Sequence, residues 1–175
     1  MKTLVISSLV SILFLVAGIT FSQQESGKLR IGTFDSRCVA LAYGRSPEFM
    51  KEVDSIKAAH NKAKEEGNNE VVTELEQLGS TKQVVMHQQV FSNGSINNIL
   101  AKIKDKFPTL AKDNNVKMIL SKWEIPFIDE SFELVDITDQ LVAMIGPDDT
   151  TKKIIDSIKA MVPIPIEQVP IDPMK

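Results

Sequence analysis

The apolar positions between residues 49 and 110 recur in steps of three and four. Three stretches share this rhythm, and they run through Phe49, Val53, Ile56, His60 and Ala63, then Val71, Leu75 and Leu78, then Ile96, Leu100, Ile103, Phe107 and Leu110. Such steps place one mostly apolar seam along a helix that packs against another helix. The pattern therefore predicts that residues 46–115 are helical and fold back on themselves as antiparallel stretches.

Residues with strong conformational preferences mark the boundaries of these helices. Ser46-Pro47-Glu48 supplies an N-cap, a proline at the first helical position and an acid in the first turn, so a helix begins there. Two dipeptides, Gly67-Asn68 and Gly79-Ser80, compete for the tip of the hairpin. The first is the stronger turn signal and is slightly favoured, with the return arm broken near Asn93-Gly94. Pro108 is expected to kink or shorten the last stretch.

Two segments of alternating apolar and polar residues flank the helical region. Residues 28–35 and 116–123 are predicted to be half-buried strands. We expect segments 29–35 and 116–123 to pair and so to close off the helical excursion between them. Residues 124–128 are a candidate third strand, placed at an edge because Pro126 cannot donate a backbone hydrogen bond.

The C-terminal part contains two short predicted helices and a proline-rich tail. The first covers 137–145 and stops at Gly146-Pro147, and the second covers about 149–161. The chain is thus predicted to be α+β, with a small β-sheet core and closing helix, a projecting antiparallel α-helical hairpin and short C-terminal helices. The core takes residues 23–45 and 116–146, the hairpin arm takes 46–115, and 147–175 form an extra helix and tail.

The N-terminus has the organisation of a secretory signal peptide. Lys2 is followed by an uncharged, mostly apolar stretch from Thr3 to Phe21, and small polar residues follow. We expect residues 1–22 to be a signal peptide cleaved after Ser22, with a retained membrane anchor as the alternative. The chain is therefore predicted to act outside the cytoplasm, in a periplasm.

Composition argues against several classes of function. The chain carries 20 Lys and Arg against 23 Asp and Glu, a net charge of −3, so it has no electrostatic basis for binding nucleic acid. A single cysteine, Cys38, excludes an intrachain disulfide and a cysteine-rich zinc site. This thiol lies in an apolar run and is predicted to be buried and inert.

Nothing in the sequence predicts catalysis. The two histidines, His60 and His87, have no partner in a recognisable catalytic pattern, and no nucleophile elbow, phosphate loop or zinc-protease motif occurs. Acids between Glu65 and Glu76 are best explained as a solvated helix face. We therefore expect a non-enzymatic protein with no cofactor, no metal and no small-molecule substrate.

Three patches of sequence, taken in order, resemble one known family. Residues 30–49 contain Ile31-Gly32-Thr33-Phe34-Asp35-Ser36 and then Ser46-Pro47-Glu48-Phe49; residues 111–123 read AKDNNVKMILSKW, and residues 134–145 read LVDITDQLVAMI. These patches look like the opening strand and first arm, the returning strand and the closing helix of the OmpH/Skp family. The resemblance covers about 30–145.

That resemblance implies a periplasmic chaperone, a holdase that binds unfolded outer-membrane proteins. In the family a small β core forms a homotrimer, and helical hairpins project from it around the client. Seven seam residues then become possible client contacts, or alternatively contacts that seal the hairpin: Phe49, Val53, Ile56, Ile96, Leu100, Ile103 and Phe107. The alternative function is an envelope structural or adaptor protein that recognises one folded partner, through residues 147–175.

Overall fold

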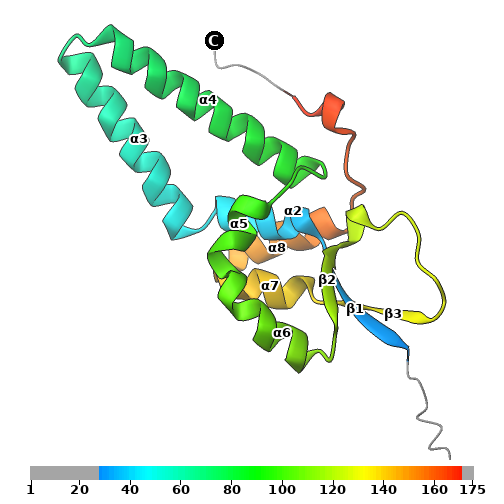
Figure 1. The fold of residues 1–175 in the computed structure, drawn as a ribbon. Helices are drawn as coiled ribbons and strands as arrows, with labels where there is room; N and C mark the ends of the chain where they lie inside the picture. Colours follow the sequence, from blue (N-terminus) through cyan, green and yellow to red (C-terminus); the bar gives the residue numbers. More distant parts are fainter. Residues whose placement is uncertain (1–27, 171–175) are drawn as a thin grey trace, which may run out of the picture.

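A three-stranded parallel sheet lies on one side of the fold, next to a group of helices (Figure 1). The computed structural model describes residues 28–170, so the predicted signal peptide lies outside the described part of the chain. Strand β1 (Leu29–Phe34) is central, with β2 (Met118–Ser121) on one side and β3 (Phe132–Asp136) on the other. The predicted pairing of 29–35 with 116–123 is confirmed, with Ile31 opposite Met118 and Phe34 opposite Ser121. The predicted α+β class is likewise confirmed.

The third strand lies later in the chain than predicted. After β2 the chain forms a short 3₁₀ turn, η2 (Lys122–Glu124), in which the Ser121 hydroxyl accepts a hydrogen bond from the Trp123 backbone N–H at 3.4 Å. That turn, followed by Pro126, carries the chain out of the sheet. Residues 124–128 therefore form no strand, and the alternating segment 132–136 takes the edge instead.

Helices make up most of the remaining structure. They are α2 (Ser36–Gly44), α3 (Pro47–Glu65), α4 (Asn69–Phe91), α5 (Asn97–Ile103), η1 (Lys104–Lys106), α6 (Phe107–Asp113), α7 (Thr138–Ile145), α8 (Asp149–Lys159) and η3 (Ile166–Gln168). Within residues 28–170 none of them is both long enough and apolar enough to cross a membrane.

Local signals account for the ends of several helices. The Ser46 hydroxyl accepts a hydrogen bond from the Phe49 N–H at 3.2 Å, as predicted for an N-cap, and α3 starts at Pro47. The chain turns at Gly67, whose φ of +70° suits glycine, and the Asn68 side chain caps α4. Gly79, the rival turn, lies inside α4. Gly146 ends α7 in the left-handed conformation.

Helix α2 is the hub of the hydrophobic core. It packs against α4, α7 and α8, and most of its side chains are buried. The core combines residues from β1, α2, α5, α7 and α8, among them Phe34, Val39, Ala42, Ile99, Leu141 and Ile155. Helix α8 therefore contributes to the core of the molecule.

The predicted arm of 46–115 is shorter in the structure. Helices α3 and α4 extend away from the sheet as a pair, whereas α5 and α6 return to it (Figure 1). Chain segment 92–96 separates the two regions, and Ser92 at the end of α4 adopts an extended conformation. The apolar stripe continues past this break, but its later members, such as Ile103 and Leu110, face the core. Pro108 lies in the first turn of α6, directly after η1 interrupts the helix.

Candidate functional site

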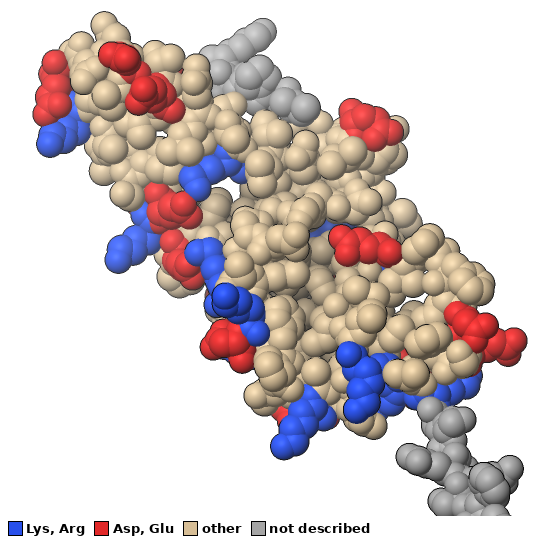
Figure 2. All heavy atoms as spheres, viewed as in Figure 1, with Lys and Arg blue, Asp and Glu red and all other residues tan. Residues whose placement is uncertain are grey.

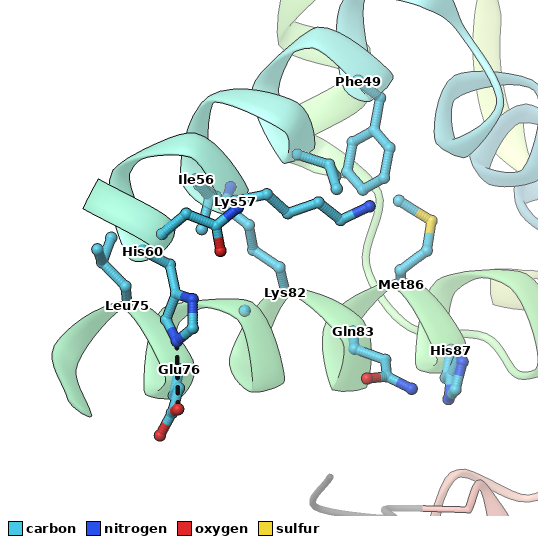
Figure 3. A pocket seen from close by; sticks show the side chains of 13 residues that line it. Phe49, Ile56, Lys57, His60, Leu75, Glu76, Lys82, Gln83, Met86 and His87 are labelled. Carbon is cyan, nitrogen blue, oxygen red and sulfur yellow. Dashed lines mark hydrogen bonds and ion pairs between the residues drawn. The ribbon is translucent and has the colours of Figure 1, made fainter. Parts of the chain in front are cut away.

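A groove lies between α3 and α4, with a volume of about 630 Å³ (Figure 3). Its apolar lining comes from both helices and consists of Phe49, Val53, Ile56, Leu75 and Met86. Polar residues complete the lining: Lys57, His60, Asn61, Glu76, Lys82, Gln83 and His87, with Gly79 among them. All five apolar side chains are only half-buried, so the pair leaves apolar surface in contact with solvent.

Three of the seven predicted contact residues, Phe49, Val53 and Ile56, line this groove. The other four lie elsewhere. Ile96 and Ile103 are 4% and 7% exposed and belong to the core. Leu100 and Phe107 border a separate hollow beside β2. The structure therefore does not bring the seven residues together on one face.

The groove also contains residues that the seam pattern did not identify as contacts. Met86 comes from α4, where Val84, Val85 and Met86 follow one another and periodicity alone does not show which side chain faces α3. Lys57 directly follows the seam residue Ile56, and no sequence signal marks it. Leu75 was already visible in the second apolar stretch.

Two polar pairs connect α3 to α4 along the groove. Lys82 Nζ lies 2.6 Å from Glu52 Oε1, and His60 Nε2 lies 3.3 Å from Glu76 Oε1 (Figure 3 shows the second pair). A hydrogen bond from Lys82 lowers the pKa of the Glu52 carboxyl below its usual value. Both pairs are partly exposed to solvent, so each contributes little to stability and serves mainly to orient the helices.

The base of α3 is held by contacts with α2 and α5. The rings of Tyr43 and Phe49 meet edge to face with centroids 5.4 Å apart. Lys102 on α5 lies 2.6 Å from Glu48 in the first turn of α3, and its ammonium also lies 5.4 Å from the Tyr43 ring centroid. These contacts fix the start of α3, and the main packing partner of the helix as a whole is α4.

A buried charge cluster at the end of β1 anchors α2 to the sheet. The Asp35 carboxylate is fully buried and accepts hydrogen bonds from Arg37, from Trp123 Nε1 at 2.9 Å and from Lys122 Nζ at 3.0 Å. Burial by itself raises the pKa of Asp35, but these donors outweigh it and lower the pKa to about 2. Both carboxylate oxygens of Asp35 therefore have donors within the protein. We assign this carboxylate a role in stabilising the fold.

One face of the sheet is a second apolar surface. Side chains alternate along each strand, so Leu29, Met118, Phe132 and Leu134 share the face that points away from the core. They are between 36% and 53% exposed. Parallel sheets are normally covered on both faces, so this face is unusually open for such a sheet.

Charge is spread widely over the surface. Figure 2 shows side chains of both signs spaced along the helix pair, with no large patch of one sign on that face. Within residues 28–170, no group of three or more His, Cys, Asp or Glu residues is placed to hold a metal ion. The candidate site is therefore defined by apolar surface and shape.

A scan against protein-family models finds no match to this chain, and comparisons with curated proteins and with solved structures find none either.

Proposed function

We propose that this protein is a non-enzymatic periplasmic chaperone of the OmpH/Skp type that holds unfolded outer-membrane proteins. The observation that supports this best is the groove between α3 and α4, an open apolar surface on a helix pair that extends from the core. A protein with no client would gain stability by closing these helices together. Leaving the groove open is consistent with a surface kept for binding.

In this proposal α3 and α4 form the antiparallel hairpin arm of the family. Residues such as Val53, Ile56 and Leu75 contact apolar side chains of the client, and each contact contributes about 1 kcal/mol or less because none is fully buried. Many weak contacts of this kind hold a chain that has no fixed structure. They also allow release when the client folds elsewhere.

The proposal includes a homo-oligomer, with three copies as in the family. The open sheet face around Leu134 supplies the surface for it, because burying exposed apolar side chains favours association. Helix pairs from several copies would then surround one client. The signal peptide at residues 1–22 remains the proposed route to the periplasm.

Aggregation of an outer-membrane β-barrel protein, diluted from urea, tests the proposed function. We expect the purified protein to suppress light scattering at ratios near one oligomer per client. Leu75→Gln should weaken the suppression severalfold, whereas Leu78→Gln should not, because Leu78 lies three residues away and outside the groove. If wild-type protein has no effect even in large excess, the holdase proposal is wrong.

A second candidate is an envelope adaptor that binds one folded partner. It is favoured by the segment after α8, where Met161, Val162 and Ile166 are 55%, 79% and 43% exposed. Pro163 and Pro165 stiffen this segment, which reduces the entropy lost on binding. Under this proposal Val162→Asp abolishes recovery of one stoichiometric partner from envelope extract and leaves oligomerisation intact. Recovery that survives the substitution would argue against it.

A further inference from the structure

We propose that the α3–α4 groove selects amphipathic polypeptide segments that carry a carboxylate beside their apolar side chains, and that Lys57 binds this carboxylate. The inference rests on the proposed function, since it names the kind of client segment that the groove accepts. Three observations carry it: the charge of the lining, the position of the Lys57 ammonium and the geometry of a gap between two helices.

The lining has an excess of positive charge. It contains two lysines, Lys57 and Lys82, against one carboxylate, Glu76. Glu76 is already paired with His60, and Lys82 is paired with Glu52. None of the ion pairs among residues 28–170 includes Lys57. One cationic group in the groove is therefore available to a ligand.

The Lys57 side chain extends across the groove instead of away from it. Figure 3 shows it reaching from α3 toward Met86 on α4, with Phe49 beside it. A segment seated on Phe49 and Met86 would remove water from around this ammonium. A charge that loses water needs an opposite charge nearby, so a ligand with no carboxylate at that point is disfavoured.

A groove between two helices suits an amphipathic helix, which packs an apolar stripe into it and keeps polar residues at the rim. Lys57 would meet an acidic residue next to that stripe. Because the lysine side chain is long and exposed, it can also swing toward solvent when no carboxylate is present. The expected discrimination is therefore modest, about fivefold in Kd, as for partly exposed ion pairs.

Two designed amphipathic peptides test the inference, one with glutamates flanking a leucine stripe and one with glutamines at the same positions. Fluorescence anisotropy should show that the glutamate peptide binds about fivefold more tightly. Lys57→Gln should remove this difference, and Lys57→Glu should reverse it in favour of a third peptide that carries lysines. Lys51→Gln is the matched control, because Lys51 is exposed on α3 outside the groove.

Each result bears on the inference separately from the proposed function. Equal affinity for the glutamate and glutamine peptides would overturn it, as would a preference that survives Lys57→Gln. If no peptide binds and the wild-type protein still suppresses aggregation, the inference fails and the holdase proposal stands. If the preference is found but aggregation is not suppressed, the groove selects acidic segments and the holdase proposal fails.

Discussion

Arg37 and Asp35, two residues apart where β1 passes into α2, form a two-point ion pair in the interior of the protein. Arg37 Nε lies 3.1 Å from Asp35 Oδ1, and Nη2 lies 2.8 Å from Oδ2. Nη2 also donates to the carbonyl oxygens of Ile158 and Met161, at 3.2 and 2.8 Å. The pair thus joins the end of the central strand to the end of α8.

Removing the Asp35 charge should destabilise the fold strongly. Asp35→Asn leaves the Arg37 guanidinium buried without a negative partner, and breaking a buried ion pair in this way costs about 3–5 kcal/mol. Urea unfolding followed by circular dichroism measures the loss. Glu133→Gln, which removes the exposed pair with Arg30, should cost about 1 kcal/mol or less. If both variants lose a similar free energy of unfolding, the buried ion pair contributes no more to stability than the exposed one.

The same carboxylate should make stability depend on acid pH. Its pKa is about 2 in the folded protein against an ordinary value of 3.8, so folding favours the ionised form. The stabilisation, about 2 kcal/mol, is fully present above pH 3.8 and is lost as pH falls through 2. The stability gap between wild type and Asp35→Asn should therefore narrow over that range. A difference in unfolding free energy that stays constant with pH would contradict the lowered pKa of Asp35.

Short-range signals predicted strands β1 and β2 and many helix ends, and they could do so because each acts within a few residues. Ser46 caps its own helix, and Gly67 and Gly146 each adopt a backbone conformation that most residues avoid. The cluster around Asp35 could not be predicted in this way. Trp123 and Lys122 are far from Asp35 in sequence, and only the pairing of β1 with β2 brings them together.

Cys38 should be unreactive in the folded protein. Burial and the neighbouring Asp35 carboxylate raise the pKa of this thiol to about 12, so it stays protonated, and no solvent reaches it. We expect no labelling by a disulfide reagent such as Ellman's reagent in native buffer and one equivalent in denaturing urea. Rapid labelling of the native protein would mean that α2 separates from α8 frequently.

Two glycines should respond in opposite directions to alanine. Gly79 lies inside α4 with open space where a Cβ would be, so Gly79→Ala should stabilise the protein by about 1 kcal/mol through helix propensity. A Cβ on Gly94 would lie 2.9 Å from the backbone carbon of Gln88, so Gly94→Ala should cost about 1–3 kcal/mol. Thermal unfolding distinguishes the two. Equal effects would mean that the turn after α4 adapts easily.

Periodicity predicted which face of each helix is apolar, but it could not predict what that face contacts. Val53 and Ile103 occupy the same kind of seam position, yet Val53 lines an open groove and Ile103 lies in the core. The difference comes from the break at 92–96, after which the chain returns to the sheet. Lys57 shows the same limit for charge, because nothing in the sequence around it indicates that its side chain reaches across the groove toward Met86.

The last prediction concerns the assembly of several copies and follows from the open face of the sheet. If this face forms the interface between copies, Leu134→Lys places a charge where water is excluded and should convert the oligomer to a monomer. Leu78→Lys is the control, because Leu78 has a similar exposure, 42% against 46%, but lies on the helix pair. Sedimentation velocity measures the oligomeric state of both variants. If the oligomer survives Leu134→Lys, the interface lies elsewhere on the protein. If the wild-type protein is a monomer, assembly is not part of the proposed mechanism, and the α3–α4 groove of a single chain holds the client.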